Sequence, residues 1–462
     1  MTIDSPATAP TRRYLHVRRE GRYDPPAVAV RLAESGLFEE SLVYASDARW
    51  WFAGGAAVVL TIHHDTVVGM GEGRRTSVPW AGSPARAIET LLADAPIRDW
   101  RLYGRLDFEL GSVSEEFPSS GLGQELGRLT VPRVEVEVDE TSLTVRALAG
   151  EDLDRVLLAA TAADRSSTTT TRPVEVETDE FALFAATVAA AIDRIRAGEL
   201  DKVVLSRGVE VPYPVDFPAT YLRGLRANTP ARSFLLDLPG LRAAGFSPET
   251  LVELDADLRI ATRPLTGTCP RDGDPVFDAR RQAALVQDAK EVYDHAISVR
   301  LAHDELAALC DPDGVGVDEF MTARERGGVQ HIGSRVFGRL DPRHGPWDAL
   351  FALFPAVTVS GVPKAVACSM IAEYEEAPRG LYAGAVVRAT HAGQLDAALA
   401  LRMVYTRDGR TWLRAGAGVV ADSRPVHEYR GTCHTLATVA PYVVPATPED
   451  EPPTVSAASA AG

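Results

Sequence analysis

The order of helix-like and strand-like segments after residue 178 constrains the fold of this chain most. Helical patterns of apolar residues alternate irregularly with short strand-like runs, and the first helical pattern closes at Gly198, a residue typical of a helix C-cap. The helical patterns cover residues 181–195, 288–309 and 425–439, and the strand-like runs cover residues 202–207, 251–260 and 263–265. Because no repeated β–α–β rhythm occurs, the pattern favours an α+β fold.

Composition and charge narrow the functional classes. With 462 residues, 45% of them hydrophobic and 24% charged, the chain can bury a large core, which excludes a disordered or fibrous protein. The net charge of −16 repels a phosphate backbone, so we expect no nucleic-acid partner. An anionic small-molecule substrate would need a local cationic site in such a protein.

The N-terminal residues and the cysteines indicate the compartment. Residues 1–13 lack the apolar core of a signal peptide, and the longest apolar stretch, residues 53–62, is about half a membrane span. The four cysteines are scattered without a C-x-x-C pair. We therefore expect a cytoplasmic protein with reduced thiols and no membrane partner.

Nine short segments follow one another in a fixed order between residues 178 and 442. They are KVVLSR (202–207), SPE (247–249), RPLTGT (263–268), KEVYDHAISVR (290–300), VQHIGS (329–334), FPAVTVSGVPK (354–364), PRGLYAGAV (378–386), LDAALALR (395–402) and WLRAGAGV (412–419). Each alone has an ordinary structural explanation, since a lysine that opens a strand is usually a solvated edge residue and S-P-E is a common turn. Their joint order resembles the chorismate-utilising enzymes: anthranilate synthase component I, aminodeoxychorismate synthase, isochorismate synthase and, most of all, siderophore-type salicylate synthase.

This resemblance implies a fold and a division of the chain. The family fold is a single large α+β unit with two stacked antiparallel β-sheets and helices packed outside. Residues 1–177 are then the N-terminal part of the fold, residues 178–442 the chorismate-binding catalytic region, and residues 443–462 a flexible C-terminal tail. By the same analogy we expect a monomer.

The resemblance also implies a reaction and two catalytic residues. Chorismate is converted to isochorismate, and salicylate synthases then eliminate pyruvate, a step thought to be pericyclic. Lys202 matches the general base that activates water for attack at ring C2, and Glu249 matches the general acid that protonates the departing C4 hydroxyl. A lysine base must lose its proton near neutral pH and a carboxylic acid must keep one, and a dry pocket favours both.

Further residues match the family's substrate pocket. Arg402 and Tyr382 correspond to the pair that holds the pyruvyl carboxylate, and an arginine can grip a carboxylate through two hydrogen bonds. Gly416 and Gly418 match backbone that approaches the substrate closely. The remaining substrate-binding candidates are Thr266, Gly267, Thr268, His331 and Thr358.

The magnesium site of the family is altered in this sequence. The family holds one Mg²⁺ between acidic residues at i, i+3 on two facing helices. The acids present here are Glu291, Asp294 and Glu428, with Asp294 one methylene shorter than the usual Glu. Gly431 replaces an expected ligand, and Thr435 replaces a lysine that binds the substrate's carboxylate. Thr266 likewise stands where the family usually has Ala. Two interpretations remain open: the three acids and waters hold Mg²⁺, or the site has lost the metal.

Three functional hypotheses follow from these residues. The first is a salicylate or isochorismate synthase with a weakened magnesium site. The second is a repurposed, metal-independent member that catalyses a pericyclic, cyclisation or lyase reaction on another substrate in specialised metabolism. The third, a non-catalytic binding protein, is disfavoured because Lys202 and Glu249 are both present.

Overall fold

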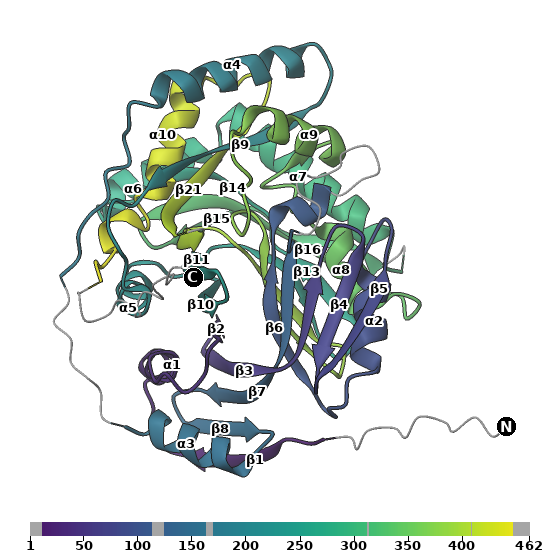
Figure 1. The fold of residues 1–462 in the computed structure, drawn as a ribbon. Coiled ribbons are helices and arrows are strands. Elements are labelled where there is room, and N and C mark those ends of the chain that lie inside the picture. Colours follow the sequence, from purple (N-terminus) through teal and green to yellow (C-terminus); the bar gives the residue numbers. More distant parts are fainter. Residues whose placement is uncertain (1–11, 113–123, 163–169, 312–313, 408, 447–462) are drawn as a thin grey trace, which may run out of the picture.

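The computed structural model describes residues 12–112, 124–162, 170–311, 314–407 and 409–446 (Figure 1). Within these ranges the chain combines antiparallel strands with helices, which confirms the predicted α+β class. The strands of the N-terminal part are β1 (Leu15–Glu20), β2 (Ser41–Ser46), β3 (Arg49–Ile62), β4 (Thr66–Gly71), β5 (Arg74–Pro79), β6 (Arg101–Leu106), β7 (Gly127–Val138) and β8 (Ser142–Ala147).

The strands that follow residue 178 supply most of the site. They are β9 (Lys202–Glu210), β10 (Arg232–Leu238), β11 (Leu241–Ser247), β12 (Thr250–Leu254), β13 (Arg259–Thr262), β14 (Leu265–Pro270), β15 (Gly316–Arg326), β16 (Val329–Arg339), β17 (Gly361–Val362), β18 (Ala385–Thr390), β19 (Leu395–Leu399), β20 (Met403–Arg407) and β21 (Arg410–Val419).

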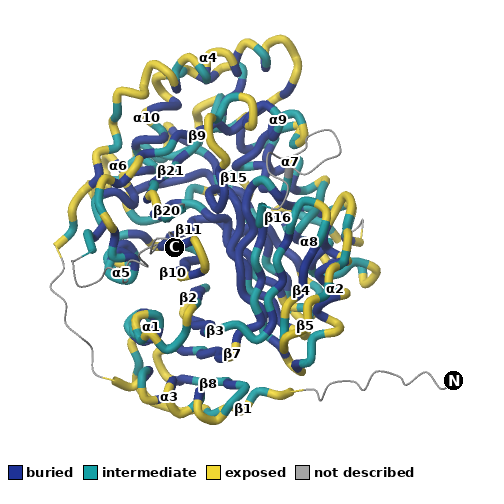
Figure 2. Tube along the Cα trace, in the orientation of Figure 1, coloured by how far each residue is buried: buried dark blue, intermediate teal, exposed yellow. Residues whose placement is uncertain are grey.

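Hydrogen bonds join the N-terminal strands and the later strands into one antiparallel network. Strand β2 pairs with β10, and β6 pairs with β18, so residues before and after 178 share the same sheet. On β3, Trp51 packs in one hydrophobic core, whereas its neighbours Trp50 and Phe52 pack in another. Side chains of a strand alternate between its two faces, so this part of the sheet is covered on both sides. Figure 2 shows the resulting column of buried strands.

Ten helices of the described ranges lie around the sheet (Figure 1). They are α1 (Pro25–Ala33), α2 (Ala85–Ala93), α3 (Gly150–Ala160), α4 (Phe181–Arg196), α5 (Phe217–Ala227), α6 (Pro275–Leu285), α7 (Ala289–Ala307), α8 (Pro346–Leu353), α9 (Lys364–Tyr374) and α10 (Pro425–Leu436). Helices α7 and α10 both pack against β14, and this arrangement places their facing sides around the site. None of the described helices is long and apolar enough to span a membrane.

The ends of these helices follow local sequence signals. The side chain of Asp288 accepts hydrogen bonds from the backbone N–H groups of Lys290 and Glu291 and so starts α7. Helix α4 ends before Gly198, which has a φ of +83°, as predicted. Helix α10 ends at Leu436, three residues before the predicted end, because the chain turns there ahead of Pro441.

The sequence predicts a flexible tail from residue 443, but the first residues of this segment are packed against the fold. Val443 and Val444 are buried, and the backbone N–H of Val444 donates to the Thr220 hydroxyl of α5. Two consecutive valines bury enough apolar surface to hold this stretch, so the packed fold extends through residue 444. Residues 447–462, together with most of the polar stretch 166–172, lie outside the described residues.

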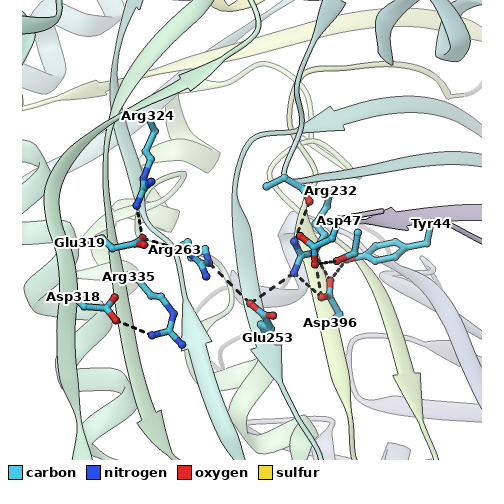
Figure 3. A network of polar contacts seen from close by, with 12 residues as sticks. Tyr44, Asp47, Arg232, Glu253, Arg263, Asp318, Glu319, Arg324, Arg335 and Asp396 are labelled. Carbon is cyan, nitrogen blue, oxygen red and sulfur yellow. Dashed lines mark hydrogen bonds and ion pairs between the residues drawn. The ribbon is translucent and has the colours of Figure 1, made fainter. Parts of the chain in front are cut away.

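A network of polar and charged side chains links several strands of the sheet (Figure 3). Arg232 on β10 binds the carboxylate of Asp396 on β19 through two 2.8 Å hydrogen bonds, and Tyr44 on β2 donates to the same carboxylate. Arg263 Nη1 lies 3.4 Å from Glu319 Oε2, and this ion pair extends the network. Paired charges of this kind fix β19, and this strand leads directly to Arg402.

Candidate active site

A cavity of about 660 Å³ lies between the sheet and helices α7 and α10. Every residue that the sequence analysis proposed for catalysis, substrate binding or metal binding lines this one cavity. They are Lys202, Glu249, Thr266, Gly267, Thr268, Glu291, Asp294, His331, Thr358, Tyr382, Arg402, Gly416, Gly418 and Glu428, and Gly431 lines it as well. Residues up to 229 positions apart in the sequence therefore meet at one concave site, as expected for a small-molecule pocket.

Lys202 opens strand β9 and is 1% exposed. Its Nζ lies 2.5 Å from Asp294 Oδ1 and donates to Ser298 Oγ at 2.9 Å. Asp294 and Ser298 are one helical turn apart on α7, so the helix presents both to the lysine. Burial raises the pKa of Asp294, but the ammonium groups of Lys202 and Lys290 outweigh it and hold that pKa below its ordinary value.

Gly418 on β21 leaves the space that this ion pair occupies. A Cβ atom at position 418 would lie 2.5 Å from Asp294 Oδ2 and 3.5 Å from Lys202 Cε. Strand β21 pairs with β9 directly beside Lys202, so only a glycine lets the two strands and α7 approach this closely.

Glu249 lies between β11 and β12 and is 4% exposed. The Thr358 hydroxyl donates to Glu249 Oε1 at 2.6 Å. Burial raises the pKa of Glu249 to about 8, although the Thr358 hydrogen bond and the Lys202 ammonium act in the opposite direction. The carboxyl group therefore keeps its proton at pH 7, which is the state that a general acid requires.

Arg402 and His331 form a buried pair on one wall of the cavity. Burial and the Arg402 guanidinium lower the pKa of His331 to about 3, so its ring is neutral at pH 7. His331 Nδ1 donates to the Gly267 carbonyl at 2.7 Å, and this leaves Nε2 to accept from Arg402 Nη2. Burial and the neighbouring Arg326 lower the pKa of Arg402 to about 9, so it is still cationic at pH 7.

The backbone at Arg402 is strained. Its φ of +47° lies in the left-handed region, which a residue with a Cβ atom rarely adopts. Such conformations persist where the surrounding structure holds them, and they cluster at functional sites. The strain indicates that the direction of the Arg402 side chain is tightly specified.

Tyr382 packs over Gly416, and both residues line the cavity. A Cβ atom at position 416 would lie 2.9 Å from the Tyr382 hydroxyl, so Gly416 provides the space for that hydroxyl. Burial raises the pKa of Tyr382 to about 12, and the phenol is therefore a neutral hydrogen-bonding group at pH 7.

The acidic end of the cavity contains two carboxylates and a lysine. Lys290 Nζ lies 3.1 Å from Glu291 Oε1 on α7 and 3.4 Å from Glu428 Oε1 on α10. Burial raises the pKa values of both carboxyl groups above their ordinary range, and Lys290 acts against that shift. Beside them, a Cβ atom at Gly431 would meet no atom of the described residues within 4 Å apart from the backbone of its own helix, so the space at this position is open.

Thr266 directs its hydroxyl toward a buried histidine. Thr266 Oγ1 lies 2.8 Å from His295 Nδ1, and His295 Nε2 lies 2.7 Å from Ser334 Oγ. Burial lowers the pKa of His295 to about 4, which leaves a neutral ring between two hydroxyls. Thr266 therefore ties β14 to α7 as well as lining the cavity.

Sequence reasoning assigned no role to Lys290, Ser298 or His295, although all three lie within the quoted segment 290–300. Ser298 lies four residues after Asp294, and this spacing signals a contact on one helix face. For Lys290 the only signal was its position next to Glu291. The direction of its long side chain depends on where α10 packs.

Comparisons with known proteins agree with this geometry. The sequence profile of the chorismate-binding enzymes matches residues 40–441. The chain is 39% identical over 436 residues to a salicylate synthase of Mycolicibacterium paratuberculosis, with 91% of this chain and 94% of that protein covered. It is 40% identical over 255 residues to anthranilate synthase component 1 of Streptomyces coelicolor, with 55% of this chain and 50% of that protein covered.

Solved structures share the fold at lower sequence identity. The menaquinone-specific isochorismate synthase MenF of Escherichia coli superposes with a TM-score of 0.71 at 19% identity, covering 94% of this chain and 95% of that chain. Anthranilate synthase component I of Streptococcus pneumoniae superposes with a TM-score of 0.70 at 23% identity, covering 86% of this chain and 93% of that chain. With this fold, this site and these relatives, the chain belongs to the family of chorismate-binding enzymes.

Proposed function

We propose that this enzyme converts chorismate to isochorismate and then to salicylate and pyruvate, an isomerase step followed by a lyase step. The observation that carries the proposal is the pairing of a buried Glu249, with a pKa of about 8, and a buried Lys202 in one cavity. The 39% identity to a salicylate synthase over nearly the whole chain supports it.

The first step needs an acid and a base. Glu249 gives its proton to the departing C4 hydroxyl of the ring, and Lys202 activates the water that attacks C2. Before it acts as a base the Lys202 ammonium must yield a proton, and Asp294 Oδ1 at 2.5 Å is an acceptor within reach.

The second step needs orientation. A pericyclic elimination of pyruvate requires no proton donor from the protein, and its rate depends on holding the enolpyruvyl group against the ring. Arg402 and Tyr382 both line the cavity, and in this proposal they hold the pyruvyl carboxylate while the neutral His331 accepts from the guanidinium and so orients it.

One experiment separates the two steps. Wild-type protein and the Glu249→Gln variant are given chorismate or isochorismate, and products are identified by mass spectrometry. We expect wild type to form salicylate from either compound, and the variant to form it only from isochorismate. A folded wild-type protein that turns over neither compound would overturn the proposal.

The open space beside Gly431 favours a second candidate. A substrate with a larger group at that end of the ring would fill it, and the enzyme would then catalyse a pericyclic, cyclisation or lyase reaction on a relative of chorismate. The same assay with chorismate analogues substituted at the ring carboxylate tests this candidate, which is supported if an analogue is consumed faster than chorismate.

A further inference from the structure

We propose that the ammonium group of Lys290 takes the place of a divalent cation at the acidic end of the cavity, so that the enzyme holds the substrate's ring carboxylate without magnesium. The inference rests on the proposed function, because it names the cation that the same site offers to its substrate.

Lys290 lies where the two acidic helices meet. It is in the first turn of α7, and its Nζ bridges Glu291 on its own helix and Glu428 on α10, at 3.1 and 3.4 Å. The side chain is 14% exposed, so the charge lies inside the cavity wall. The lysine thus neutralises, across the two helices, the same carboxylates that would ligate a metal.

The third acid is also engaged. Asp294 Oδ1 is 2.5 Å from Lys202 Nζ, so each of the three carboxylates has an ammonium partner. Among the residues that the structure describes, no three His, Cys, Asp or Glu side chains are grouped to hold a metal ion. The donor set therefore does not fit Mg²⁺ in the arrangement shown.

The fourth acidic residue of the family's metal site is missing, because position 431 is a glycine. Gly431 is three residues after Glu428 on α10, and in the part of the chain that the structure describes no atom outside its own helix backbone lies within 4 Å of where its Cβ would be. Magnesium can be held by one or two carboxylates and waters, so the missing ligand alone does not decide the question. The decisive feature is Lys290, because a divalent cation between Glu291 and Glu428 would have to displace it or be repelled by it.

The same geometry leaves donors and acceptors for a substrate. An ammonium group has three N–H donors, and two of them suffice for Glu291 and Glu428, which leaves one for a ring carboxylate. Glu291 Oε2 is buried and has no hydrogen-bond partner within the described residues. It can accept from a substrate hydroxyl, and so it need not indicate a missing metal.

Electron paramagnetic resonance of Mn²⁺, an oxygen-ligated stand-in for Mg²⁺, tests the proposal directly. Wild-type protein, with and without chorismate, should leave the signal of free Mn²⁺ unchanged up to about 1 mM metal. The double variant Asp294→Glu/Gly431→Glu restores the family's set of four acidic residues on α7 and α10. Position 431 has room for the new side chain. We expect this variant to bind Mn²⁺ and so to reduce the free signal.

Lys290→Met tests whether the lysine and a metal compete. The substitution frees Glu291 and Glu428, so we expect it to bind Mn²⁺ more tightly than wild type does. Wild-type binding below about 1 mM, or no gain of binding in either variant, would overturn the proposal. This readout needs no turnover and remains decisive if chorismate is not the substrate.

Kinetics give the second readout. In EDTA, Lys290→Met should raise the KM for chorismate about 10- to 100-fold, the usual effect of losing a charged hydrogen bond, and change kcat less. Lys364→Met is the matched control, because Lys364 pairs with Glu305 and does not line the cavity. Wild-type turnover abolished by EDTA and restored by Mg²⁺ would contradict the proposal while upholding the proposed function.

Discussion

The ammonium group of Lys202 and the carboxylate of Asp294 form a 2.5 Å ion pair in which both side chains are buried. One residue opens a strand and the other lies on α7, so the pair couples the candidate base to the helix that borders the acidic end of the cavity. Asp294 is therefore the ion-pair partner of Lys202, and under our proposal this pairing keeps Asp294 from serving as a metal ligand.

Breaking this pair should destabilise the protein strongly. Lys202→Met or Asp294→Asn alone leaves a buried charge without its partner, and we expect each to cost about 3–5 kcal/mol of unfolding free energy. The double variant should cost much less than the sum, as denaturant unfolding would show. The exposed pair Arg410–Glu210 is the control, and no measurable coupling is expected there. Additive effects at Lys202 and Asp294 would contradict the ion pair.

Glu249 should impose a pH dependence on activity. With a pKa of about 8, its carboxyl group is protonated below that pH and able to donate. We therefore expect kcat/KM for chorismate to fall as the pH rises through about 8, measured by continuous product assay. The kcat/KM for isochorismate should not fall in this pH range. An equal fall in kcat/KM for both substrates would argue against Glu249 as the acid.

The same group should also affect stability. Its folded pKa of about 8 lies above the ordinary 4.5, so its favourable contribution is complete below pH 4.5 and is lost as the pH rises toward 8. Glu249→Gln removes this loss, so the variant should gain stability over wild type with rising pH, on the order of 4 kcal/mol by pH 8. Thermal unfolding from pH 5 to 9 measures the gain, and a constant difference would contradict the raised pKa.

Two glycines of the cavity should respond oppositely to alanine. Gly418→Ala places a Cβ 2.5 Å from Asp294 Oδ2, so we expect a loss of about 1–3 kcal/mol of stability and a large loss of activity. Gly431→Ala meets no atom within 4 Å and should stabilise α10 by about 1 kcal/mol. The free energies of unfolding of both variants, measured by chemical denaturation, check these two predictions. A destabilised Gly431→Ala would mean that the space beside α10 is filled.

Arg402→Lys should impair binding of the pyruvyl carboxylate. A lysine keeps the charge but loses the planar pair of donors, so we expect kcat/KM to fall about 100-fold, chiefly through KM. Arg388→Lys is the control, because Arg388 is half-buried, its guanidinium stacks over the Trp51 ring, and it is not among the residues that line the cavity. Steady-state kinetics on both variants would show the contrast, and equal effects would refute a special role for Arg402.

The sequence predicted much of this site because the ordered segments specify both the strands and the residues at their ends. The starts of α4, β9 and α10 agree with the sequence pattern, since helix-starting residues, prolines and strand-like runs are local signals. Local signals do not predict the contact between Lys202 and Asp294, because this contact depends on how β9 and α7 pack together.

What the sequence could not predict depends on side-chain direction and on contacts distant in the chain. Lys290 has four rotatable bonds, and only the arrival of α10 with Glu428 fixes its ammonium group. Thr266 was predicted only as a substrate-binding residue in place of the family's usual Ala, yet its hydroxyl also lies 2.8 Å from His295 Nδ1. Val443 and Val444 looked like a tail, because the α5 surface that they cover is more than 200 residues away in sequence.

The most direct test of the account is the product of chorismate in the absence of added metal. Purified protein with chorismate and EDTA is followed by salicylate fluorescence and by a coupled pyruvate assay. We predict salicylate and pyruvate in equal amounts, with isochorismate as the intermediate. Folded protein that forms neither salicylate nor pyruvate from chorismate in EDTA would contradict this prediction.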